Sequence, residues 1–227
     1  MNPQDTLDRL DQLIQSRSIL CHPFYVAWQR GELSGEQLAT YARVYYPHVA
    51  SFPRYLEAAI DSADDPVIRA ELERNLTDER MVPKAHNELW LDFAECLGLE
   101  RASVVSGDWH PAAEAIVHAF DRLTGDGSAG ALAVLYAYES QQPEVSREKM
   151  DGLRRNYGMD SPEALAYFEV HAEADILHKE GERLALLRCL EDGASAEAVL
   201  DSAAEALEAY WGLLDGVCAE AGIPLTD

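Results

Sequence analysis

The stretch HAEADILH, residues 171–178, lies within the longer segment AYFEVHAEADILHKEGERLALL. It places His171, Asp175 and His178 at spacings of four and three residues. At about 100° per residue of an α-helix, these side chains fall within roughly 60° of one helical face. Tyr167 and Phe168 belong to the same face, so we expect it to point inward. The same spacing also arises by chance on an exposed helix, so a metal site would need further ligands elsewhere in the chain.

Helical periodicity extends over nearly the whole chain. Apolar residues recur at three- and four-residue spacing, and no segment shows the convincing alternation of a half-buried strand. Residue types that begin helices precede several of the apolar segments. The sequence therefore predicts one all-α domain, residues 1–227, built as a bundle of seven or eight helices with short loops. The expected helix starts are Ser34, Asp65 with Pro66, His110 with Pro111, Ser161 with Pro162, and Ser195.

Prolines inside these segments mark expected kinks or breaks, because proline lacks the backbone N–H that a helix interior needs. We expect interruptions near Pro47 and Pro53 in the segment that follows Ser34. A further interruption is expected near Pro143. Pro83 is expected either to kink a helix or to open a new one.

The composition excludes several classes of partner. The 227 residues include 41 acidic and 18 basic ones, a formal net charge of −23, and phosphate binding needs a basic cluster, so no nucleic acid is expected. No run of about 18 uncharged apolar residues exists, so no membrane partner is expected. The polar start MNPQDTLDRLDQLIQ lacks the features of a secretory signal, and we expect a cytoplasmic protein. The four cysteines form no CxxC pair, which disfavours a zinc knuckle.

Two other segments offer ligands that would complete a metal site with HAEADILH. Glu79 and His86 are seven residues apart in LTDERMVPKAHNELW, close to one face if the helix is continuous across the intervening proline. Glu139 follows the uncharged run ALAVLYAY, and a carboxylate buried there needs a partner such as a metal ion. Asp78 and Glu88 are better explained as surface residues.

The candidates form a set of three imidazoles and three carboxylates on three helical segments. Bundles that hold two metal ions use inward-facing Glu and His side chains from several helices. Oxygen and nitrogen ligands suit iron or manganese, and three carboxylates leave two divalent cations with a net charge of about +1. The predicted metal ligands are Glu79, His86, Glu139, His171, Asp175 and His178.

With these residues in place, the chain resembles the chlamydial protein associating with death domains and its bacterial relatives. The resemblance runs from HPFYVAWQRGELSGEQLATYARVYY through DERMVPKAHNELWLDFAECLG and YESQQPEVSREKMDGLRRNYG to YFEVHAEADILHKEGE. The six predicted ligands match the pattern of that family in kind and order. The resemblance implies a haem-oxygenase-like bundle, the fold shared with the TenA and pyrroloquinoline-quinone synthase families. It also implies a buried di-metal site, iron with iron or manganese.

The resemblance further implies an oxidase that makes p-aminobenzoate for folate biosynthesis, with O2 and an external reductant as co-substrates. In that family the ring is thought to come from a tyrosine of the protein itself and the amine from a lysine, so each chain reacts once. The matching positions are Tyr25 in HPFY for the ring and Lys149 in SREKM for the amine. Tyr41 and Tyr138 match further tyrosines near that site.

Two alternatives stay open at the level of sequence. A related di-metal oxidase acting on a separate small molecule would turn over repeatedly. A non-enzymatic helical interaction module would not need His171 or Asp175. A TenA-like hydrolase, which uses a cysteine, is disfavoured because no cysteine lies between Cys96 and Cys189. A homodimer is expected for this fold, and the reductant is unidentified.

Overall fold

The computed structural model describes residues 2–81, 84–106 and 108–225, which form eleven α-helices, one 3-10 helix and no strand. The all-α prediction is therefore confirmed. The helices are α1 (Pro3–Ser16), α2 (Pro23–Arg30), α3 (Gly35–Ser62), α4 (Pro66–Met81), α5 (His86–Cys96), α6 (Arg101–Val105), α7 (Pro111–Thr124), α8 (Ser128–Glu139), α9 (Gln142–Asn156), α10 (Pro162–Glu191) and α11 (Ala196–Ala221), with the 3-10 helix at Ile19–Cys21.

The described helices outnumber the seven or eight expected, and the prolines explain part of the difference. Pro143 stands in the first turn of α9, where its missing N–H has no helical partner to lose, so α8 and α9 are separate helices. The short helices α2 and α6 were not predicted. By contrast, of the kinks or breaks expected at Pro47 and Pro53, a break is wrong, because α3 continues through both prolines. Its start is fixed by a capping box between Ser34 and Gln37, and it packs against six other described helices.

Pro83 lies outside the described residues. On either side of it, α4 ends at Met81 and α5 begins at His86, so Glu79 and His86 belong to separate helices. The expected caps at Ser161 and Ser195 are present, since each hydroxyl accepts a hydrogen bond from a backbone N–H three residues on.

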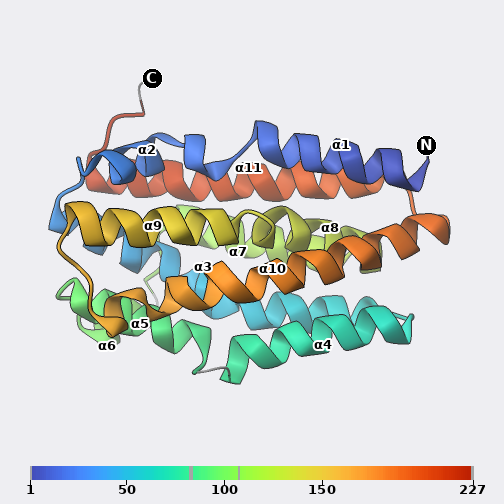
Figure 1. Cartoon of the computed structure of the whole chain (residues 1–227), viewed down its shortest axis with the longest axis horizontal. Helices are drawn as coiled ribbons and strands as arrows, with labels where there is room; N and C mark the ends of the chain where they lie inside the picture. The colour runs from blue at the N-terminus through green and yellow to red at the C-terminus, as the bar shows by residue number, and fades with distance from the viewer. Residues whose placement is uncertain (1, 82–83, 107, 226–227) are drawn as a thin grey trace.

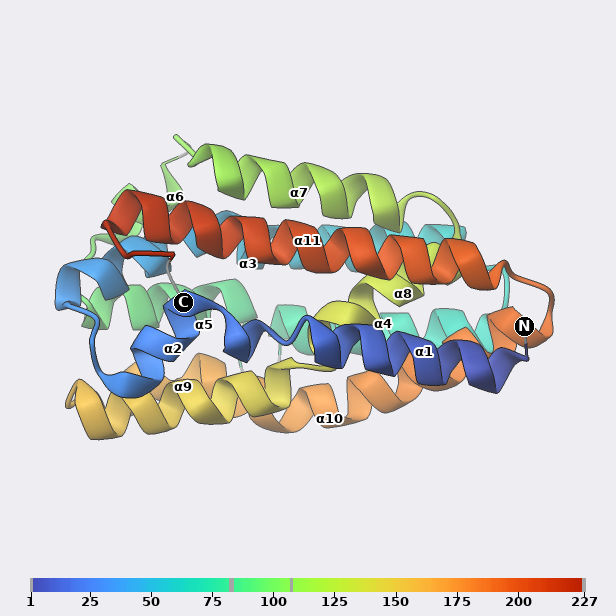
Figure 2. The same cartoon turned by 90° about the horizontal axis from the view of Figure 1, so that it is seen from above.

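The long helices run along the length of the molecule, with α10 passing through its middle (Figure 1). Helix α10 contacts α9, α8, α5, α4 and α1, so side chains on several of its faces are enclosed by neighbours. Turned by 90°, α11 lies between α7 and α1, both of which it contacts (Figure 2). None of the described helices is long and apolar enough to cross a membrane.

A close approach between α2 and α9 positions one end of the core. The indole Nε1 of Trp28 donates a hydrogen bond of 3.2 Å to the backbone oxygen of Lys149. Three residues on, a Cβ added to Gly152 would lie 2.5 Å from the same Nε1 atom. Only glycine leaves room for this indole, so Gly152 lets Trp28 hold the segment of α9 that carries Lys149.

Replacing Gly152 with alanine should destabilise the protein by about 1–3 kcal/mol, because the added methyl group overpacks the Trp28 contact. The matched control is Gly212→Ala in α11, where an added Cβ meets no atom within 4 Å and should be neutral or stabilising by up to about 1 kcal/mol. The measurement is the free energy of unfolding from urea denaturation. Equal stabilities for the two variants would contradict the proposed packing role.

Candidate metal centre

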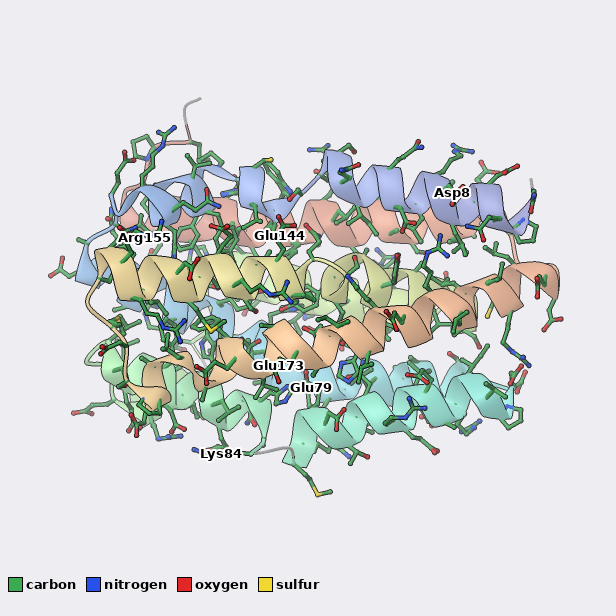
Figure 3. All side chains as sticks on the ribbon, in the orientation of Figure 1. Asp8, Glu79, Lys84, Glu144, Arg155 and Glu173 are labelled. Atoms are coloured by element: carbon green, nitrogen blue, oxygen red, sulfur yellow. The ribbon has the colours of Figure 1, made fainter. Side chains whose placement is uncertain are left out.

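Two groups of three buried side chains face each other across the middle of the bundle. In each group, ligand-type atoms of all three residues lie within 4.8 Å of one another. The first site draws on three helices and the second on two, and Glu79 is labelled where α4 approaches α10 (Figure 3). The structure thus brings together all six residues predicted as ligands. The first site contains Glu79, His86 and His171, and the second contains Glu139, Asp175 and His178.

Helix α10 supplies three of these residues from one buried face. His171, Asp175 and His178 are each at most 5% exposed, whereas Glu173 and Leu177 on the other side of the helix are exposed. The inward orientation expected from the spacing in HAEADILH is therefore present. This helix reaches both sites because its ligands extend over two turns.

In the first site, one carboxylate lies between two imidazoles. Glu79 Oε1 is 2.9 Å from His86 Nδ1 and 3.6 Å from His171 Nε2. The other ring nitrogen of His171 lies 2.7 Å from the backbone oxygen of Tyr167, to which it donates a hydrogen bond. That bond fixes the tautomer and leaves Nε2 as the electron-pair donor directed at the site.

In the second site, neighbours on α4 orient two of the three ligand-type residues. His178 Nδ1 lies 3.1 Å from Asp175 Oδ1, while its Nε2 lies 3.1 Å from Asp78 Oδ2. The Asn75 amide donates to both oxygens of Glu139 at 3.0 Å. Asp78 and Asn75 therefore occupy the supporting positions that orient metal-binding side chains in proteins.

The donor atoms of the two sites do not all find hydrogen-bond partners, and metal ions would supply the missing partners. Asp175 Oδ2 is buried and accepts no hydrogen bond among the described residues. A cavity of about 10 Å³, roughly the room that one water molecule needs, is bordered by residues of both sites. Tyr138 and Tyr167 also line it. The orphaned oxygen and the shared cavity are what a pair of adjacent metal positions with an open side would require.

Without metal, the ionisable groups stabilise one another by sharing protons. Burial opposes the ionised form of Glu79, but the imidazoles of His86 and His171 outweigh it and lower the pKa of this carboxyl group. Burial likewise opposes the charged form of His178, yet nearby carboxylates, Asp175 foremost, raise its pKa to about 10. Metal binding needs neutral imidazoles, so loading would release protons from this cluster.

Lys149 is fully buried in a cage of aromatic rings. Its Nζ atom is 5.2–5.9 Å from the centres of five rings, and it donates a hydrogen bond of 2.7 Å to the hydroxyl of Tyr41. Burial lowers its pKa from 10.5 to about 7. The cage thus keeps a large share of the amine neutral near physiological pH. The rings belong to Tyr25, Tyr41, Tyr45, Trp90 and Phe168.

The hydroxyl groups of five buried tyrosines lie close to one another. The hydroxyls of Tyr25 and Tyr41 are 3.3 Å apart. Those of Tyr45 and Tyr138 are 2.9 Å apart, and Tyr45 also donates to Tyr210 at 3.0 Å. The structure therefore places three predicted residues, Tyr25, Tyr41 and Lys149, in direct contact and locates Tyr138 on the wall of the metal cavity. Burial, the main cause, raises the pKa of all five phenols above the ordinary value of 10.

A series of ring contacts connects the first metal site with the lysine cage. The ring of Tyr167 lies 4.2 Å from that of His171 and 4.7 Å from that of Trp90. Trp90 in turn stacks on Tyr45 at 5.0 Å and meets Tyr41 at 5.5 Å. Oxidisable side chains thus fill the space between the metal ligands and the tyrosines around Lys149.

Several residues of the site were missed at the sequence level. Asp78 was assigned to the surface, yet it contacts His178 although it is one-third exposed. Asn75 and Glu182 were not considered, although each lies on the same face of its helix as a predicted ligand, four residues from Glu79 and His178 respectively. The spacing could have revealed both. No sequence signal distinguished Tyr167 and Trp90 from other core aromatic residues.

The fold and the site together define a class of protein. Residues 39–211 match the family described as iron-containing redox enzymes, and the chain belongs to this family. It is thus a haem-oxygenase-like redox enzyme, and the non-enzymatic alternative is not supported.

Individual relatives within this class are similar to the chain over most of its length. The 4-aminobenzoate synthase of Chlamydia trachomatis is 41% identical over 210 residues, which cover 92% of this chain and 90% of that protein. The enzyme of the same name from Nitrosomonas europaea is 37% identical and covers 92% and 89%. A CADD-like protein of unknown function from Nostoc punctiforme shares the fold, with a TM-score of 0.75, 19% identity, and coverage of 97% and 99%. These matches confirm the family that the sequence resembles.

We predict that the protein binds two divalent metal ions per chain and that each site can be emptied separately. His171→Ala should remove the ion of the first site and Glu139→Ala that of the second, because each change deletes one of three ligands. The matched control is His118→Ala, which removes an exposed imidazole on α7. The measurement is metal content after anaerobic loading with Fe(II) and Mn(II). Full metal content in both ligand variants would contradict the assignment.

Proposed function

We propose that this enzyme makes 4-aminobenzoate from one of its own tyrosines, with Lys149 as the amine donor. The observation that carries the proposal is the cage itself. A buried amine with a lowered pKa contacts the rings of Tyr25 and Tyr41, and oxidisable rings join that cage to the metal site. The names of the relatives at 37–41% identity support the product.

The two sites have different donor sets, and this difference supports a choice of metals. The first site offers two imidazoles and one carboxylate, the facial triad of non-haem iron enzymes. The second offers two carboxylates and one imidazole, a harder set that suits manganese or iron. We therefore propose iron in the first site and manganese or iron in the second. When bound, the pair would use O2 and external electrons to supply oxidising equivalents.

The protein supplies the proton and nitrogen chemistry around the reacting ring. Tyr25 is protonated at rest, because burial above all raises the pKa of its phenol. Its hydroxyl lies against that of Tyr41, which accepts a hydrogen bond from Lys149. The Tyr41 hydroxyl therefore lies between the phenol, which loses a proton on oxidation, and the amine, which must stay neutral to react. The surrounding rings exclude water, so that the amine, not water, is the nucleophile nearest the oxidised ring.

The size of the cavity favours an internal substrate over a separate one. The cavity bordered by both metal sites has a volume of about 10 Å³, too small for a free aromatic or fatty acid molecule. A tyrosine already packed in the core needs no such space. An oxidase acting on a separate small molecule is therefore the less favoured alternative. The homodimer stays a prediction.

Protein carrying ¹³C-labelled tyrosine rings should release labelled 4-aminobenzoate, at most about one molecule per chain, in unlabelled buffer with Fe(II), Mn(II), reductant and O2. Tyr25→Phe should lose the product, because the phenol is the proposed ring source. Tyr136→Phe is the matched control, since its hydroxyl contacts Asp11 on α1 outside the cage. Mass spectrometry of the product and of the peptide containing residue 25 provides the measurement. Unlabelled product, or many products per chain, would favour the separate-substrate alternative.

The initial rate of product formation should rise with pH through about 7 and level off above it. Burial lowers the pKa of Lys149 to about 7, so the neutral amine falls to about a tenth at pH 6. Lys149→Arg, which stays charged, should give no product at any pH while retaining both metal ions. The rate is measured between pH 6 and 8.5 in samples of equal metal content. A flat profile at constant metal content would contradict the role of this amine.

A further inference from the structure

One buried carboxyl group of the centre has no role in the two sites described above. Glu182 lies on α10, four residues after His178 and seven after Asp175, on the same helical face. Its side chain is 1% exposed, and neither carboxyl oxygen accepts a hydrogen bond from an N–H or hydroxyl group of the described residues. A buried carboxyl group with two unsatisfied oxygens needs a specific partner.

The nearest polar groups are acidic as well. Glu139 is the charged group with the largest effect on the Glu182 carboxyl, and Asp175 and Glu71 also act on it. Glu71 approaches closely because α10 has Gly181 at the crossing, where an added Cβ would lie 2.2 Å from Glu71 Oε1. Two adjacent carboxylates in a dry interior cannot both be ionised unless a proton or a cation lies between them.

Glu139 already accepts hydrogen bonds from a neutral donor. The Asn75 amide donates to both of its oxygens at 3.0 Å, and the Glu182 carboxyl acts on the same group. Neither lysine nor arginine is among the groups with the largest effect on Glu182. The cationic neighbour of the pair is the imidazole of His178, itself a predicted ligand, whose Nδ1 atom lies 4.0 Å from Glu139 Oε2.

We propose that Glu182 is a seventh metal-binding residue, a carboxylate ligand of the second site beside Glu139, Asp175 and His178. This assignment rests on the di-metal centre of the proposed function and extends it. With Glu182 the centre holds four carboxylates, which balance the charge of two divalent cations. The second site then has three oxygen donors from carboxylates and one imidazole nitrogen, a set still harder than that of the first site.

The competing explanation is structural, and it makes a different prediction for one substitution. A protonated Glu182 that only donated a hydrogen bond to Glu139 could be replaced by glutamine, whose amide also donates. A metal ligand could not, because a neutral amide is a much weaker ligand than a carboxylate. Glu182→Gln therefore separates the two explanations with little change in side-chain shape.

The test is an anaerobic titration with Mn(II), with free Mn(II) measured by electron paramagnetic resonance. Glu182→Gln should weaken one of the two binding events by about tenfold or more and leave the other unchanged. Glu173→Gln, an exposed carboxylate on the same helix, is the matched control and should titrate like the unmodified protein. Thermal unfolding of the metal-free variants checks that each is folded.

A second variant makes the outcome decisive. Glu182→Met can neither bind a hard cation nor donate to Glu139, so under the proposal it weakens the same binding event as Glu182→Gln. Unchanged Mn(II) binding in Glu182→Gln together with weakened binding in Glu182→Met would overturn the proposal in favour of the structural hydrogen bond. The titration involves no product, so its failure and that of 4-aminobenzoate synthesis are distinguishable.

Discussion

The structure depends on one electrostatic constraint: ionisable side chains are enclosed where water cannot solvate their charges. Three imidazoles and four carboxyl groups lie at most 5% exposed within the bundle. An unpaired buried charge is strongly destabilising, so such a cluster persists only if protons or cations neutralise it. Without metal, histidine–carboxylate contacts neutralise the cluster, and they raise the pKa values of the imidazoles of His171 and His178. Two divalent cations would do it with every imidazole neutral.

The cost of burying a charge also determines the protonation of Lys149, but here it favours the neutral form. This amine has no carboxylate partner in the cage, so burial shifts it toward the neutral form. Around it lie rings and one hydroxyl acceptor from Tyr41. One half of the core therefore gathers negative charge suited to cations, and the adjoining half keeps an amine uncharged. The ring contacts through Trp90 and Tyr167 connect the halves, so metal chemistry and nitrogen chemistry occur in one continuous interior.

The sequence predicted what local spacing determines and missed what helix packing determines. The pattern of His171, Asp175 and His178 was readable because a single helix sets those positions. The seven-residue spacing of Glu79 and His86 suggested one face, yet the two residues meet because α4 and α5 converge on α10. Lys149 has exposed neighbours in Arg147 and Glu148, and its burial follows from the rings that α2, α3, α5 and α10 place around it. Glu182 was overlooked among the charged residues of HKEGER, although it continues the ligand face.

The interior of the bundle is expected to hold two metal ions, one within each three-residue group. Diffraction from crystals of the metal-loaded protein, recorded at the iron and manganese absorption edges, tests it most directly. We expect two anomalous peaks, one among Glu79, His86 and His171 and one among Glu139, Asp175 and His178. Well-ordered crystals of the loaded protein with no peak at either position would contradict it.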